Sequence, residues 1–178
     1  MVSVSTPFSS VDTPALLLDM DRLEANIEEM ARLAGDAGVR LRPHTKIHEC
    51  ADIVLMQLGS GAVGASTSKL AEAEAMADAG IDDIMVVHPF YGHLKMEALK
   101  NLLERPALKL SVVVDMFEQA EAISQVGDAL RKPVSVLLKI DAGGRRFGCL
   151  PGEPAVVLAR AIQELSGVHL VGILAHES

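Results

Sequence analysis

The stretch Leu41-Arg42-Pro43-His44-Thr45-Lys46-Ile47-His48 concentrates basic side chains in a short run between an apolar entry and a helix-like segment. Side chains alternate between the two faces of a β-strand, so a strand over 41–46 directs Arg42, His44 and Lys46 to one side. Three basic groups on one face repel each other unless an anion or a buried site compensates them. A lysine in such a setting is a candidate amine nucleophile. The alternative is a surface strand with solvated basic residues.

On both sides of this stretch, short apolar runs alternate with helical patterns. The expected strands cover residues 15–18, 41–46, 61–65, 84–87, 108–114, 134–140 and 168–174. The expected helices cover residues 49–58, 70–79, 94–103, 117–126 and 154–165, after a first helix that Asp19 or Asp21 begins and Gly35 ends. Continuous apolar strands that alternate with helices indicate a parallel sheet covered on both faces. The fold class is therefore α/β.

The regular alternation favours a (β/α)₈ TIM-type barrel over a nucleotide-binding sheet, because no glycine fingerprint follows the first strand. A complete barrel needs about 250 residues, whereas the chain has 178. The last expected element is a strand without a following helix, so we expect an incomplete barrel. Sites in such folds gather at the carboxyl ends of the strands. The polar residues expected there are Lys46, Ser66, His88, Asp115, Asp141 and His176.

Composition excludes several classes of protein. The formal net charge of −8 argues against a nucleic-acid partner, which normally selects for a basic patch. Two cysteines, Cys50 and Cys149, give no disulfide framework and suit a reducing compartment. No apolar run approaches the ~20 residues that span a membrane, and the first ten residues lack a secretory signal pattern. We expect a cytoplasmic protein with no membrane partner.

The order of several motifs resembles one enzyme family. These motifs are Thr13-Pro14-Ala15 through Asp19, Arg42-Pro43-His44-Thr45-Lys46, Gly61-Ala62-Val63-Gly64, Lys69 with Glu72-Ala73, and Asp141 to Gly148. They resemble the N-terminal part of the D-threonine aldolase and D-serine dehydratase family. Members are fold-type III pyridoxal-phosphate enzymes and are related to the N-terminal domain of alanine racemase. The resemblance covers nearly the whole chain.

The resemblance implies a domain organisation. Residues 1–20 would form an N-terminal segment whose strand, 15–18, pairs with a C-terminal β-domain that lies past Ser178. Residues 21–178 would form a partial pyridoxal-phosphate-binding barrel with about six barrel strands, beginning at 41–46. We expect a divalent metal only in the absent C-terminal part and no metal site in this chain. The full-length form is expected to be a homodimer, and the 178-residue chain alone is expected to be inactive.

The resemblance also implies site residues. Lys46 matches the lysine that holds pyridoxal phosphate as a Schiff base, and His44 in the same run is assigned to cofactor binding. Arg146 matches the arginine that approaches the cofactor ring, and His176 matches a histidine near the end of the sixth barrel strand. Gly143-Gly144 either cradles a phosphate through backbone N–H groups or forms a tight turn that directs Arg146.

The implied function is that of a pyridoxal-phosphate-dependent lyase acting on D-β-hydroxy amino acids. The reaction is either aldol cleavage, as in D-threonine aldolase, or elimination, as in D-serine dehydratase. Two alternatives share the fold: an amino-acid racemase and a non-catalytic pyridoxal-phosphate-binding barrel. A metal-dependent hydrolase using His44, His48, His88 and His176 is a further possibility, but no Asp or Glu stands beside these histidines in a recognised ligand spacing.

Overall fold

A computed structural model describes residues 8 and 10–177 of the chain. Within these residues five parallel strands form one sheet, in the order β1-β2-β3-β4-β5. The strands are β1 (Ala65–Thr67), β2 (Asp83–Val86), β3 (Lys109–Val114), β4 (Val134–Ile140) and β5 (Val168–Ala175). The helices are α1 (Met20–Asp36), α2 (Ala51–Gly59), α3 (Leu70–Asp78), α4 (His93–Leu103), α5 (Phe117–Leu130) and α6 (Glu153–Gln163), with a short 3₁₀ turn, η1 (Thr45–Ile47).

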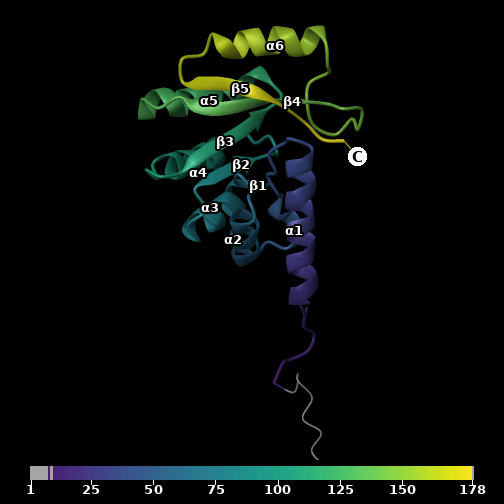
Figure 1. Cartoon of the computed structure of the whole chain (residues 1–178). Coiled ribbons are helices and arrows are strands. Elements are labelled where there is room, and N and C mark those ends of the chain that lie inside the picture. The colour runs from purple at the N-terminus through teal and green to yellow at the C-terminus, as the bar shows by residue number, and fades with distance from the viewer. Residues whose placement is uncertain (1–7, 9, 178) are drawn as a thin grey trace, which may run out of the picture.

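Each strand pairs with the next strand along the chain, and a helix connects each pair. This succession of β-α-β units in one direction is the construction of a (β/α) barrel, here over part of its circumference. Figure 1 shows α6 beside β5 at one end of the sheet and α1 near the opposite end. The predicted α/β class and incomplete barrel are therefore confirmed.

The core is aliphatic, as the near absence of aromatic residues requires. The side chains of Val112 and Val114 in β3 are 0% exposed, and β4 contributes Val136 and Leu138 to the same cluster. In α3 the buried residues are spaced three apart and form one stripe that packs on the sheet; they are Leu70, Ala73 and Met76. Burial of these side chains is the main favourable term that holds the strands in register.

The expected strand at 41–46 is wrong over its second half. The chain is extended up to His44, which forms a single parallel bridge to Ser66 of β1, and then turns into η1. The turn forms because the His44 side chain accepts a hydrogen bond from the backbone N–H of Lys46. Instead of the expected six barrel strands, the described part of the chain therefore has five and one bridged segment.

Two other predicted strands also differ from the structure. Residues 15–18 form no strand: the side chains of Leu16, Leu17 and Leu18 are 101%, 58% and 62% exposed, and no other strand pairs with them among the described residues. The strand expected at 61–65 begins only at Ala65, because the amides of Gly61 and Ala62 still bond to carbonyls of α2. The expected partner of residues 15–18 lay past Ser178, so that pairing stays a prediction.

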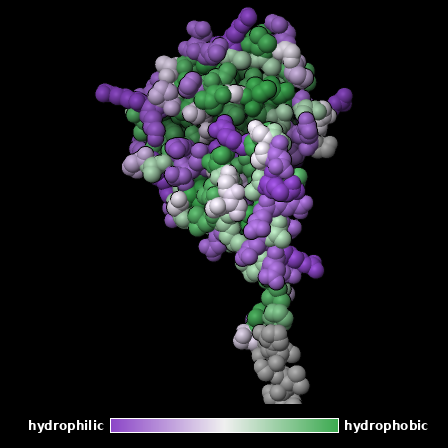
Figure 2. Space-filling model, in the orientation of Figure 1, coloured by the Kyte–Doolittle hydropathy of each residue, from purple (hydrophilic) through white to green (hydrophobic). Residues whose placement is uncertain are grey.

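The surface differs between the two ends of the sheet. Figure 2 shows hydrophilic side chains over α1 and a hydrophobic area over the part of the molecule that holds β4, β5 and α6. On β5, the alternating side chains of Val171 and Ile173 are 49% and 69% exposed. No helix among the described residues is long and apolar enough to cross a membrane.

Candidate functional site

A cavity of about 360 Å³ opens at the carboxyl ends of the strands. Its wall combines residues from almost the whole length of the chain. They are Arg42, His44, Lys46, Ser66, Val87, His88, Lys139, Gly144, Arg146, Phe147, Leu174, Ala175 and His176. The structure thus brings together the four residues that the sequence singled out, Lys46, His44, Arg146 and His176.

The turn that carries Lys46 is held by its neighbours on both sides. The Nδ1 atom of His44 accepts a hydrogen bond from the Lys46 backbone N–H at 3.1 Å. Thr45, which is 1% exposed, donates its hydroxyl to the carbonyl of Ser66 at 3.3 Å. The Ser66 amide in turn donates to the carbonyl of Pro43 at 2.8 Å. The backbone of Lys46 is therefore fixed against β1 while its side chain remains exposed.

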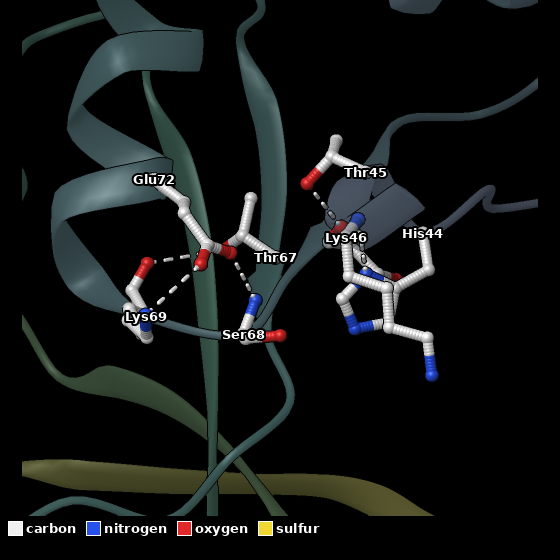
Figure 3. A network of polar contacts seen from close by, with 8 residues as sticks. His44, Thr45, Lys46, Thr67, Ser68, Lys69 and Glu72 are labelled. Carbon is white, nitrogen blue, oxygen red and sulfur yellow. Dashed lines mark hydrogen bonds and ion pairs between the residues drawn. The ribbon is translucent and has the colours of Figure 1, made fainter. Parts of the chain in front are cut away.

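Figure 3 shows two separate polar groups around β1. His44 and Lys46 lie together on the turn, whereas Glu72 of α3 lies with Ser68 and Lys69. A Glu72 carboxylate oxygen accepts from the Ser68 N–H at 2.7 Å. No side chain caps the N-terminus of α3 through its N-cap residue, and the bond from Ser68 to Glu72 lies just before that end of the helix. Glu72 thus reaches back to the backbone before the helix.

The three basic side chains of the 41–46 segment share the cavity but do not carry three free charges. Arg42 forms an ion pair with Asp83 of β2, with 2.8 Å between Nη1 and Oδ1, and also donates to the Asp83 carbonyl at 3.2 Å. Its guanidinium is therefore compensated within the protein. Arg42 thus ties the extended segment to β2, and Lys46 is left as the free amine of this segment in the cavity.

Lys139 is a cavity residue that sequence reasoning did not select. It lies in β4, is 4% exposed, and donates its ammonium to the carbonyl of Val87 at 2.8 Å. Burial lowers the pKa of Lys139, Asp115 opposes this, and the nearby Arg146 lowers it further. The available signal was a lysine inside the otherwise apolar run Val134–Ile140, since an ionised side chain there needs a buried partner.

The turn after β4 presents Arg146 to the cavity. Asp141 accepts hydrogen bonds from the backbone N–H groups of Gly143 and Arg145 at 2.9 and 3.0 Å, so it caps its own turn. Arg145 has a φ of 49° and is not among the cavity residues, whereas Arg146 lines the cavity. Among the two interpretations of Gly143-Gly144, these contacts favour a tight turn that directs Arg146.

Phe147 organises the cationic wall of the cavity. Its ring lies 5.2 Å from the ring of His88, measured between centroids. The Lys139 ammonium lies 5.9 Å and the Arg146 guanidinium carbon 5.5 Å from the same centroid. An aromatic face attracts cations, so Phe147 stabilises the approach of charges that otherwise repel each other.

Two histidines of the cavity, His44 and His88, have a lowered pKa. Burial lowers the pKa of His44 most, and the charge of Lys46 lowers it further. Glu72 opposes this, and His88 and His176 have smaller lowering effects. Burial also lowers the pKa of His88, with Lys139 as the largest electrostatic cause. Because Nδ1 of His44 accepts a hydrogen bond, its neutral ring carries the proton on Nε2. Their surroundings therefore favour the neutral imidazole form of His44 and His88.

His48 does not belong to the cavity. Its Nδ1 accepts a hydrogen bond from the Cys50 N–H at 3.1 Å, so the ring bonds to the backbone at the start of α2. Within residues 8 and 10–177, no cluster of His, Cys, Asp and Glu side chains is arranged to hold a metal ion.

The fold and the cavity define a (β/α)-barrel chain with an amine-bearing, basic site at its strand ends. The sequence profile of the alanine racemase N-terminal domain family matches residues 18–178. The chain belongs to this family.

Three individual proteins illustrate the similarity. The D-threonine aldolase of Arthrobacter sp is 37% identical over 170 residues, which cover 96% of this chain and 44% of that protein. The D-threo-3-hydroxyaspartate dehydratase of Delftia sp. is 34% identical and covers 94% of this chain and 44% of its own length. The crystal structure of D-threonine aldolase from Filomicrobium marinum superposes with a TM-score of 0.86 at 40% identity, over 92% of this chain and 44% of that one. The chain thus spans less than half the length of these relatives.

Proposed function

We propose that this chain supplies the cofactor-holding part of a pyridoxal-phosphate-dependent lyase that acts on D-3-hydroxy amino acids. The observation that carries the proposal is the amine of Lys46 on a fixed turn in a basic cavity at the strand ends. Relatives above 30% identity are an aldolase and a dehydratase of such amino acids, which supports a lyase. Aldol cleavage and dehydration remain alternative outcomes for this chain.

The residues present fit the cofactor chemically. Pyridoxal phosphate carries an aldehyde, an aromatic ring and anionic oxygens, and it withdraws electrons from a bond of the amino acid to which it is joined. The cavity supplies a free primary amine in Lys46, a guanidinium in Arg146 and an aromatic ring in Phe147. These groups complement the aldehyde, the oxygen and nitrogen acceptors, and the ring face, respectively. An acidic or purely apolar cavity would not complement these groups of the cofactor.

Each chain residue has a specific task in this proposal. Lys46 would hold the cofactor through its aldehyde, and His44 keeps the lysine backbone in place through the bond to its N–H. Arg146 would donate to the ring nitrogen. Arginine remains protonated at working pH, so it can only donate there and leaves that nitrogen without a proton. His176 would approach the cofactor from the end of β5.

The test is reductive labelling of the 178-residue protein with pyridoxal phosphate and borohydride, followed by peptide mapping. We expect the label on the peptide that contains Lys46. The matched controls are Lys46→Arg, which keeps the charge but should lose the label, and Lys69→Arg, which should keep it. Lys69 is exposed and lies in the short connection between β1 and α3. A label on Lys69 or Lys139 in place of Lys46, or no label, would contradict the proposal.

The reaction itself is tested on a protein extended to the length of its relatives. D-Threonine, D-serine and 3-hydroxy-D-aspartate are the substrates to compare. Glycine with an aldehyde among the products indicates aldol cleavage, and a keto acid with ammonia indicates dehydration. Formation of the L-enantiomer alone would favour a racemase. Binding of pyridoxal phosphate without turnover of any of these amino acids would favour the non-catalytic carrier.

A further inference from the structure

Asp115, at the end of β3, reaches across to the turn after β4. Its Oδ2 accepts a hydrogen bond from the backbone N–H of Gly148 at 2.9 Å, across 33 positions of sequence. Its own backbone N–H donates to the Gln119 side chain at 2.9 Å, and Gln119 is 5% exposed. Asp115 does not line the cavity. The Gln119 side chain holds the backbone of Asp115, and the Asp115 carboxylate connects β3 to the turn that carries Arg146.

Gly148 is the point where this turn rejoins the sheet. Its φ is 113°, and an added Cβ would lie 2.5 Å from the carbonyl carbon of Ile140. The turn returns alongside β4 through bonds from the Cys149 N–H to the Lys139 carbonyl and from the Asp141 N–H to the Cys149 carbonyl, both 2.9 Å. The bond to Asp115 thus fixes the residue that immediately follows Arg146 and Phe147.

The charge of Asp115 also acts on Lys139. Among the described residues, the charged groups that act on Lys139 are Asp115, which favours the ammonium form, and Arg146, which disfavours it. Lys139 also acts on His88, which lies across the Phe147 ring. Lys139 is a second primary amine on the wall that carries Lys46. A deprotonated Lys139 would be a competing nucleophile for an aldehyde in this cavity.

We propose that Asp115 is a positioning residue with two effects: it anchors the turn that presents Arg146, and it supports the bond of Lys139 to the Val87 carbonyl so that aldehyde chemistry occurs at Lys46. The selection of Lys46 over Lys139 rests on the proposed cofactor function. The anchoring and the ionisation of Lys139 do not.

Three variants separate the two effects. Asp115→Asn keeps an oxygen acceptor for the Gly148 N–H but removes the charge. Asp115→Ala removes both. Asp141→Ala is the matched control, because it releases the Gly143 and Arg145 amides in the same turn and leaves Asp115, whose charge acts on Lys139, in place.

The first measurement is the pH dependence of Lys139 acetylation, determined by competitive labelling and mass spectrometry without any cofactor. Asp115→Asn and Asp115→Ala should both shift the acetylation profile of Lys139 to lower pH, and Asp141→Ala should not. An unchanged profile in Asp115→Asn overturns the proposed ionisation of Lys139, whatever the chain binds.

The second measurement is native-state cleavage by trypsin after Arg145 or Arg146, which reports opening of the turn. Loss of a hydrogen bond to a charged group should raise this cleavage rate roughly tenfold or more in Asp115→Ala. Asp115→Asn should change the rate much less, because its amide oxygen replaces the acceptor. Equal cleavage rates in the original protein and Asp115→Ala overturn the anchoring role.

The third measurement repeats the borohydride labelling with pyridoxal phosphate on Asp115→Asn. Part of the label should move from Lys46 to Lys139, and the double variant Asp115→Asn, Lys139→Arg should return it to Lys46. If the acetylation profile shifts but the label stays entirely on Lys46, the selection role is wrong. If the original protein takes no label at Lys46, the cofactor proposal has failed, and the first two measurements still judge Asp115.

Discussion

Replacement of Gly148 by alanine tests whether the close return of the turn to β4 holds this part of the cavity together. Gly148 has a φ of 113°, and an alanine Cβ would lie 2.5 Å from the Ile140 carbonyl carbon and 2.9 Å from its oxygen, and closer still to the amide of Asp141. Backbone atoms cannot move aside as a flexible side chain can. Gly143 in the same turn is a matched control, because its φ is 105° and an added Cβ meets nothing within 4 Å.

The two substitutions share one cost and differ in another. Forcing a residue with a side chain into such a backbone conformation costs about 1–3 kcal/mol, and both variants carry this cost. Gly148→Ala must also displace the backbone, which endangers the charge-assisted bond to Asp115 and at least one bond of the Cys149 ladder. These losses add about 2–4 kcal/mol.

The assay is thermal and urea unfolding followed by circular dichroism. For a chain of this size, each 1 kcal/mol shifts the melting temperature by about 2–4 °C. Gly148→Ala should therefore melt about 4–16 °C below Gly143→Ala. Equal melting temperatures for the two variants would refute the reasoning, because the close contact would then carry no free energy of its own.

Three further outcomes follow from the cavity and the sheet edge. Because the pKa values of His44 and His88 are lowered in the folded protein, the unfolded chain binds protons more readily. The free energy of unfolding should therefore fall as the pH drops below about 6.5. Replacing both histidines by Asn should make this fall smaller, as measured by urea titrations at several pH values. Arg146→Ala should weaken the absorbance change caused by added pyridoxal phosphate, whereas Arg145→Ala should not; the opposite ranking would mean that the turn is in another register. The isolated chain should self-associate in light-scattering measurements through the exposed β5, and Val171→Lys with Ile173→Lys should reduce this; a monodisperse monomer before substitution would contradict it.

The sequence predicted the β/α alternation because each buried strand is a continuous apolar run. Strands such as β3 and β4 fall within a residue or two of the predicted ranges, since their apolar side chains have no other place to be buried. The run at 15–18 is equally apolar but forms no strand, because strand formation also requires a neighbouring chain. Local pattern measures the tendency to be buried, and it does not identify the partner.

The sequence predicted the cavity residues that lie within short, recognisable motifs. The run from Arg42 to Lys46 and the turn before Arg146 are short sequences, and both reach the cavity. Lys139 was missed because its role depends on a contact across the sheet, with Val87, which is 52 positions away in the sequence. Asp115 was expected at the strand ends, but its bond to Gly148, 33 positions away, was not foreseen. Only the topology brings these partners together.

The net charge of the chain differs in sign from the charge of the cavity wall, and this bears on the class of ligand. A net charge of −8 describes the chain as a whole, yet the cavity wall carries Lys46, Lys139 and Arg146. A cleft lined by one sign of charge focuses its field and raises the local concentration of counter-ions. The acidic exterior repels polyanions such as nucleic acid, whereas a small anion that enters the cavity meets fixed cations. The overall charge therefore argues against a large anionic partner and is compatible with a small anionic ligand.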